Sequence, residues 1–152
     1  MRMLQFIAVM LTALALVPTG AHFFELPNKM ALTRQQYLTV QQIYRGWALF
    51  GVVLIAAIVF NLTAAIALWR RRERFWPSLV AGLLMAATLL IFFAWTYPAN
   101  EATANWTMLP ANWSALRRQW EFSHAVNALV SFAALGFAAL AMIGAPVGDG
   151  RY

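Results

Sequence analysis

Four long apolar stretches follow one another along this chain, with short polar segments between them. They run from Leu4 to Phe24, from about Gly46 to Trp69, from Pro77 to Tyr97 and from about Trp120 to Ile143. Crossing a bilayer takes about 20 mostly apolar residues, and a lipid-exposed span must satisfy its own backbone hydrogen bonds. The pattern therefore predicts four transmembrane helices, the last of which is expected to stop at Gly144-Ala145-Pro146.

Composition supports this pattern. Of the 152 residues, 62% are hydrophobic and 11% are charged, whereas soluble domains average about 45–50% and roughly 25%. We therefore expect a single all-α membrane domain over residues 1–152, an antiparallel four-helix bundle embedded in lipid. The net charge of +6 is explained by basic residues beside the spans, so no nucleic-acid partner is expected. Because the chain has no cysteine, it has no disulfide, zinc–thiolate site, iron–sulfur cluster or cysteine nucleophile.

The basic run Arg70-Arg71-Arg72-Glu73-Arg74 predicts the orientation. Positive residues mark cytoplasmic loops, so the loop 70–76 and both termini are expected inside, with segments 25–45 and 98–119 outside. The expected location is the inner (plasma) membrane of a bacterium. A cleaved signal peptide ending at Ala21 is an alternative for the first stretch. The apolar run continues through Phe23 and Phe24, which favours a retained span.

Both outer segments carry signs of structure. Thr33-Arg34-Gln35-Gln36 has the spacing of a capping box, in which the Thr and Gln side chains satisfy free backbone donors. This predicts that the second span extends outward as a helix from about Thr33. The segment 98–119 is rich in Asn, Trp and Pro and is expected to form a packed outer cap.

Small and polar residues recur at steps of three and four along the first and fourth spans. This is the spacing of a bundle seam, along which helices approach closely and hydroxyl groups bond across. The seam positions are Gln5, Ala8, Thr12, Ala15, Thr19 and His22, then Arg117, Glu121, His124, Ala128, Ser131 and Leu135. In the second span, Asn61 is expected to hydrogen-bond to another helix rather than act as a ligand.

Two His/Glu pairs are the strongest chemical signal. His22 and Glu25, and Glu121 and His124, stand three residues apart in opposite chain order, so each pair shares one helix face. In an antiparallel bundle both pairs lie near the outer boundary. The chain has only 2 histidines and 5 acidic residues, and ionisable groups within spans mark functional sites. We therefore take these four residues as candidate catalytic residues and metal ligands.

Several interpretations of the pairs remain open. Imidazole and carboxylate groups suit iron, copper or zinc. Because the second and third spans contain no Asp or Glu, a mononuclear site fits better than a di-iron centre. A metal-free acid–base site is equally compatible, and a haem bound axially by His22 and His124 ranks lower. The pairs could also be buried ion pairs, with Arg117 or Arg118 as a further partner.

The last third of the chain carries a recognisable set of residues. It contains Tyr97-Pro98-Ala99-Asn100, Asn112-Trp113-Ser114-Ala115-Leu116-Arg117 and Trp120-Glu121-Phe122-Ser123-His124. Together with His22-Phe23-Phe24-Glu25-Leu26-Pro27, these runs resemble the anthrone oxygenase-like family of small four-helix membrane proteins. Hydropathy and length match that family over nearly the whole chain. Most members are filed as a domain of unknown function, and characterised ones oxygenate anthrones to anthraquinones.

The resemblance implies an oxidoreductase or oxygenase for an apolar, aromatic or phenolic substrate, with oxygen as the second reactant. His22 or His124 would remove a proton, Glu25 or Glu121 would orient the imidazole, and a pocket under the cap would hold the substrate. Residues expected to bind the substrate are Asn100, Trp113, Arg117 and Trp120. The alternative class is a non-catalytic membrane subunit or assembly factor, in a homo-oligomer or with a membrane-protein partner. A carrier or channel ranks last, because four spans leave little room for a pathway.

Overall fold

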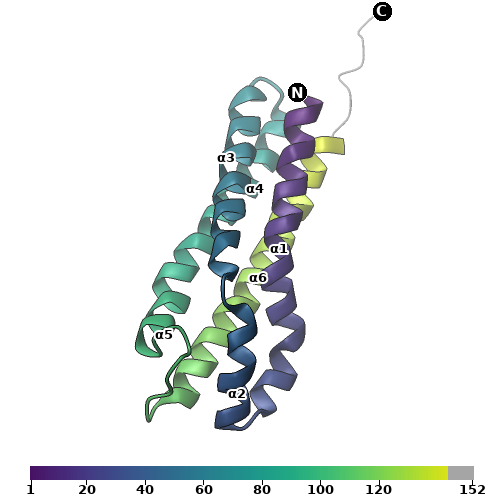
Figure 1. Ribbon diagram of the computed structural model, residues 1–152. Helices are drawn as coiled ribbons and strands as arrows, with labels where there is room; N and C mark the ends of the chain where they lie inside the picture. Colours follow the sequence, from purple (N-terminus) through teal and green to yellow (C-terminus); the bar gives the residue numbers. More distant parts are fainter. Residues whose placement is uncertain (144–152) are drawn as a thin grey trace, which may run out of the picture.

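The computed structural model describes residues 1–143, and these form helices joined by short turns (Figure 1). Four long helices build the body of the molecule: α1 (Arg2–Ala31), α3 (Phe50–Ala67), α4 (Arg72–Ile91) and α6 (Trp113–Ile143). Two short helices, α2 (Arg34–Gln41) and α5 (Tyr97–Ala102), lie at the same end of the molecule. No strand occurs within residues 1–143. The predicted stop at Gly144-Ala145-Pro146 lies outside the described residues.

The long helices form an antiparallel bundle, as expected. Both α1 and α4 pack against α3 and α6, and successive long helices run in opposite directions (Figure 1). The N-terminus and the α3–α4 turn therefore lie at one end of the bundle. The other end carries the segments that we call the cap, residues 32–49 and 97–112.

Four helical stretches are long and apolar enough to cross a membrane. They are Arg2–Ala31, Trp47–Ala67, Arg72–Ala102 and Trp113–Ile143. Large apolar side chains, Phe6, Leu14, Val59, Leu90 and Phe132 among them, stay exposed on the outer faces of these helices, as lipid contact requires. The first, third and fourth stretches run past their predicted boundaries at the cap end. Part of each predicted outer segment is therefore a continuation of a long helix.

The outward extension of the second span is only partly as predicted. Thr33 caps α2, and both hydrogen bonds of the capping box are present. The chain does not continue from there as one helix, because Gly46 adopts a left-handed backbone with φ +89°. Two single 3₁₀ turns, η1 (Gln42–Tyr44) and η2 (Trp47–Leu49), flank this glycine. A left-handed residue ends a helix, which is why α3 begins only at Phe50.

Small residues line the middle of the bundle. Ala15, Ala57, Met85 and Ala134, one from each long helix, meet in a common core cluster. The seam on α1 is buried at Gln5, Ala8, Thr12, Ala15 and His22, whereas Thr19 is partly exposed. On α6, Glu121, Ala128 and Ser131 are buried, and Arg117, His124 and Leu135 are partly exposed. Asn61 Nδ2 donates to Thr12 Oγ1 at 2.9 Å, so its predicted interhelical bond is confirmed.

The cap packs around Trp106. A π-helical turn, η3 (Phe92–Thr96), joins α4 to α5, next to Pro98, which cannot donate a backbone hydrogen bond. After α5, three consecutive residues, Ala104, Asn105 and Trp106, have left-handed backbones with φ of 47°, 55° and 59°. This turn inserts Trp106, which is 3% exposed, between Tyr37 and Trp120. Burial of the indole offsets strain of about 1–2 kcal/mol per left-handed residue.

Candidate functional site

The two histidines lie together. His22 on α1 and His124 on α6 have ring centroids 4.4 Å apart, at the end of the bundle that carries the cap. His22 is buried at 4% exposure, and His124 is partly exposed. The antiparallel packing of α1 against α6 thus joins the two His/Glu pairs into one cluster.

A lysine stands at the centre of this cluster. Lys29 is 3% exposed, and its Nζ lies 2.9 Å from Glu121 Oε1 and 3.8 Å from Glu25 Oε2. The same Nζ lies 3.2 Å from His22 Nδ1. An ammonium ion offers three donors and no acceptor, so it links the histidine to both carboxylates.

Lys29 was not among the predicted site residues. It falls in the segment predicted to lie outside the first span, because the apolar stretch was expected to end near Phe24. In the structure α1 continues through Pro27 to Ala31. His22, Glu25 and Lys29 follow one another at steps of three and four, so they share one helix face. That spacing is visible in the sequence and is the signal that could have found Lys29.

Glu121 is fully buried and is held from two sides. Besides the Lys29 ion pair, its Oε1 accepts a hydrogen bond of 2.8 Å from the Tyr37 hydroxyl, and Tyr37 itself is 0% exposed. Burial and the adjacent carboxylate raise the pKa of Tyr37 above its ordinary value, so the phenol stays protonated and donates. In the ion-pair interpretation of the His/Glu pairs, Arg117 or Arg118 was the further partner. The structure has Lys29 in that place, and Arg117 donates to the backbone carbonyls of Lys29 and Leu32.

Glu25 has a different environment. Its side chain is 39% exposed, and its Oε2 accepts a hydrogen bond from the Tyr44 hydroxyl and lies 3.8 Å from His22 Nδ1. Burial and this hydrogen bond raise the pKa of Tyr44, so Tyr44 also remains a neutral donor. The two carboxylates of the cluster are therefore distinct: Glu121 is sealed inside, and Glu25 reaches the surface.

Aromatic rings enclose the polar atoms. The His22 ring lies 4.4 Å from Tyr44, 5.6 Å from Trp47 and 4.8 Å from Trp120, measured between centroids. The Lys29 ammonium lies 4.6 Å and 4.7 Å from the ring centres of Tyr44 and Trp120, within cation–π range. The polar atoms of the cluster are thus enclosed by aromatic rings that pack directly against them.

Of the four predicted substrate-binding residues, only Trp120 contacts the histidines. Its ring lies 4.2 Å from that of His124. Asn100 Oδ1 accepts hydrogen bonds from the indoles of Trp120, at 2.8 Å, and Trp106, at 3.2 Å, so it stands behind Trp120. Arg117 and Trp113 stack on each other, 4.7 Å apart, in the packing between α2 and α6. These three residues support the walls and do not face the histidine pair.

Hydrogen bonding distinguishes the two imidazoles. His22 Nδ1 faces the Lys29 ammonium, which can only donate, so this nitrogen accepts and the proton of neutral His22 is assigned to Nε2. Within residues 1–143, His124 Nδ1 and Glu121 Oε2 are buried atoms without a hydrogen-bond partner. Buried polar atoms are seldom left unpaired, which points to a ligand or water at these two atoms.

The four His/Glu residues do not fit a metal as they are arranged. Residues 1–143 contain no group of three or more His, Asp or Glu side chains placed to hold one. The Lys29 ammonium already binds the His22 nitrogen and the Glu121 oxygen that a metal would need, and a second cation there would be repelled. An axial haem does not fit either. With metal–nitrogen bonds near 2 Å, the ring centroids of two imidazoles on opposite faces of a porphyrin stand about 6 Å apart. The ring centroids of His22 and His124 are only 4.4 Å apart.

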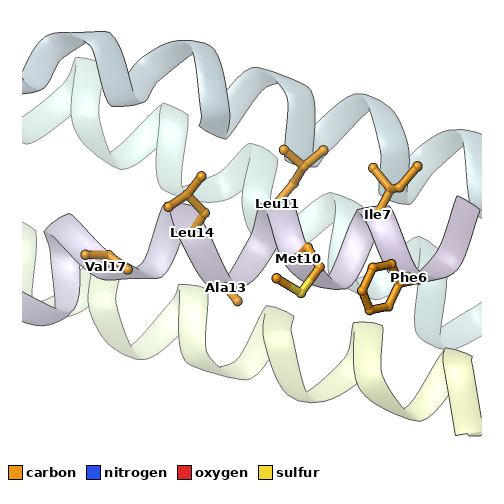
Figure 2. Close-up of a pocket in the computed structure, with 7 residues that line it drawn as sticks. All are labelled: Phe6, Ile7, Met10, Leu11, Ala13, Leu14 and Val17. Carbon is orange, nitrogen blue, oxygen red and sulfur yellow. The ribbon is translucent and has the colours of Figure 1, made fainter. Parts of the chain in front are cut away.

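A shallow apolar depression of about 450 Å³ lies elsewhere, along the outer face of α1. Figure 2 shows that its lining side chains all come from that helix: Phe6, Ile7, Met10, Leu11, Ala13, Leu14 and Val17. It contains no polar group that could orient a substrate, and it lies on the lipid-facing surface, away from the histidines.

No family model, curated protein or solved structure matches this chain. The likeness to the anthrone oxygenase-like family therefore rests on the residues quoted above and stays a prediction.

Proposed function

We propose that this protein is a membrane-embedded oxygenase that removes a proton from an apolar aromatic or phenolic substrate at a metal-free His/Lys/Glu site. The observation that carries the proposal is the His22–His124 pair, 4.4 Å between ring centroids, with Lys29 and two carboxylates beside it. Buried ionisable groups within a span are expensive and are typically kept for function. The aromatic walls suit a substrate that partitions into lipid.

The two histidines would have different roles. His124 is the base, because its Nδ1 is buried and unpartnered and so can accept a proton. His22 is the electrophile: Lys29 occupies its Nδ1, which leaves the Nε2–H to donate to the oxygen on which negative charge develops. Two like groups with opposite roles set by their surroundings are a recurrent arrangement in acid–base catalysis.

The resulting anion would react with molecular oxygen, which is the oxidant. For an activated methylene group, loss of two hydrogens and uptake of O₂ gives a carbonyl and one water. One oxygen atom enters the product, and the other leaves in the water. The protein supplies the proton transfer and stabilises the anion, while the apolar walls exclude bulk water. We place this site at the outer face of a bacterial inner membrane.

The test is turnover of anthrone, a methylene substrate of the implied class, followed by oxygen uptake and anthraquinone formation in detergent or nanodiscs. We expect His124→Ala to lower the rate by about 10²–10⁴-fold, the usual contribution of a positioned base. Glu101→Gln, an exposed change in the cap, is the matched control. Turnover that survives both His124→Ala and His22→Ala in folded protein, or turnover that is abolished by metal chelation, contradicts the proposal.

A non-catalytic subunit is the second candidate. The bonds among Lys29, Glu121 and Tyr37 join α1, α6 and α2, so they also fasten the cap to the bundle. A protein with this role tolerates His22→Ala and His124→Ala without loss of function. It loses its membrane-protein partner, or its own oligomer, when the cap is disrupted by Trp106→Ala.

A further inference from the structure

The turn between α3 and α4 carries the longest run of basic residues in the chain. Arg70, Arg71 and Arg72 follow one another there, all of them exposed, and the exposed Glu73 comes next. The start of α1, where Arg2 is also exposed, lies at the same end of the bundle (Figure 1). Within residues 1–143, the three consecutive arginines form no ion pair. Their guanidinium groups are therefore open to an anion from outside the chain.

An aromatic ring positions one of these guanidinium groups. The Cζ atom of Arg70 lies 4.9 Å from the centre of the Trp69 ring, within cation–π range. Stacking on a ring face leaves the guanidinium N–H donors unused, and these donors match the oxygens of a phosphate in a forked geometry. Because the side chain is already held, less of its freedom is lost when a phosphate binds.

Apolar side chains lead from Trp69 along the outer face of α3. Val59 and Ile66 are seven residues apart, or two helical turns, so they share one face; they are 51% and 72% exposed. Trp69 follows in the next turn, where its backbone N–H donates to Ile66 O at 3.3 Å, and it is 62% exposed. Tryptophan is typical of the headgroup level of a membrane. The surface therefore joins a cationic group to an apolar strip, as a phospholipid joins a phosphate to acyl chains.

We propose that the α3–α4 turn binds an anionic phospholipid, with the headgroup phosphate on Arg70, Arg71 and Arg72 and the acyl chains along α3 beneath Trp69. Charge complementarity favours a headgroup with net negative charge, because a zwitterionic headgroup brings its own cation close to the arginines. A soluble phosphate ion could bind the same arginines but could not contact the apolar strip, which favours a lipid. The inference is independent of the proposed function.

The experiment uses the full chain in detergent with equimolar phosphatidylglycerol and phosphatidylcholine of matched acyl chains. Native mass spectrometry measures how much of each lipid stays bound to the protein. We expect bound phosphatidylglycerol to exceed bound phosphatidylcholine about fivefold or more, the effect of one basic residue near a membrane surface. Arg70→Gln/Arg71→Gln should bring the ratio close to equality. Arg45→Gln/Arg118→Gln, which removes two exposed arginines at the cap end, is the matched control and should keep the preference.

Two further arms separate a lipid site from general attraction to anions. Trp69→Ala removes the ring under Arg70 and should lower the preference about two- to fivefold, whereas Trp76→Ala, at a second exposed indole, should leave it unchanged. In the same detergent, phosphatidylglycerol should raise the melting temperature by binding the folded protein. Inorganic phosphate and glycerol phosphate at the same concentration should not raise it.

Four outcomes overturn the inference. They are the absence of a preference in the wild type, an equal loss in both arginine variants, an unchanged preference in Trp69→Ala, and stabilisation by inorganic phosphate equal to that by phosphatidylglycerol. The last result would make the arginines a site for a soluble anion. None of these measurements involves turnover, so failure of the lipid site and failure of the proposed oxygenase are distinguishable.

Discussion

At the scale of single residues, the ion pair between Lys29 and Glu121 is the most consequential contact. Both side chains are nearly or fully buried, and their charged atoms are 2.9 Å apart. Removing one partner of a buried pair leaves a charge without compensation and costs about 3–5 kcal/mol. We expect Lys29→Met to lower the free energy of unfolding by that amount, measured by thermal or SDS-induced unfolding in detergent.

The control for this prediction is a double-mutant cycle. In Lys29→Met/Glu121→Gln neither side chain is charged, so much of the lost stability should return. Additive losses from the two single changes would contradict the idea that these groups compensate each other.

Two tyrosines make stability depend on alkaline pH. The pKa values of Tyr37 and Tyr44 are raised in the folded protein, whereas a tyrosine in the unfolded chain has a pKa of about 10. The unfolded chain therefore binds fewer protons above that pH, and the stabilisation present below it is lost as pH rises. We expect the melting temperature to fall above about pH 10, less steeply in Tyr37→Phe/Tyr44→Phe.

Tyrosinate absorbance checks the same point directly. The absorbance of folded protein near pH 11 should be the same in wild type and Tyr37→Phe, because Tyr37 does not ionise there. A smaller signal in the variant would show that Tyr37 titrates normally and that its hydrogen bond to Glu121 is absent in solution.

At the scale of helices, Gly82 marks a close approach of α4 to α3. A Cβ at this position would lie 2.6 Å from Leu62 Cδ2 and 3.3 Å from the Leu62 backbone nitrogen. We expect Gly82→Ala to destabilise the bundle by about 1–3 kcal/mol, as overpacking does. Gly136→Ala is the matched control, since nothing lies within 4 Å of its Cβ. Equal stability of the two variants would exclude this close packing, whereas Leu62→Ala should partly rescue Gly82→Ala.

The course of each helix could be predicted from the sequence only where local chemistry decides it. The Thr33 capping box and the apolar length of the spans are local signals. The continuation of α1 past Pro27 and the break at Gly46 were not predicted. At a proline or a glycine a helix can either continue or end, and here packing against the cap decides which of the two occurs. For this reason the His/Glu pairs were identified but Lys29 was not.

At the scale of the whole molecule, two basic residues of the predicted outer side are used in packing. Lys29 is a positive residue on the predicted outer side, yet it is buried and paired with Glu121. Arg117 likewise points into the packing and donates to backbone carbonyls. The cap end therefore presents fewer positive charges to water than its sequence suggests, as expected if Arg70-Arg71-Arg72 marks the cytoplasmic side.

This orientation is testable because the chain has no cysteine. Single cysteines at Glu73, in the first turn of α4, and Met108, in the cap, are both exposed positions. We expect a membrane-impermeant maleimide to label Met108→Cys in intact bacterial cells and to label Glu73→Cys only after lysis. The reverse pattern would invert the topology and place the candidate site on the cytoplasmic side.

The bundle class could be predicted because hydropathy and length dictate it. The site could be predicted only in part. The antiparallel packing of α1 and α6 brings the two His/Glu pairs together, as expected, whereas the inward position of Lys29 follows from the continuation of α1 to Ala31, which was not predicted. The roles of Asn100, Trp113 and Arg117 depend in the same way on how the cap folds.

The central claim is that the two histidines share one site and differ in role because Lys29 occupies His22 Nδ1. Long-range ¹⁵N–¹H NMR of histidine-labelled protein at neutral pH identifies which ring nitrogens carry protons. The account expects neutral His22 in the Nε2–H form, with this preference lost in Lys29→Met. A His22 ring protonated at Nδ1, or a ring unaffected by Lys29→Met, would contradict it.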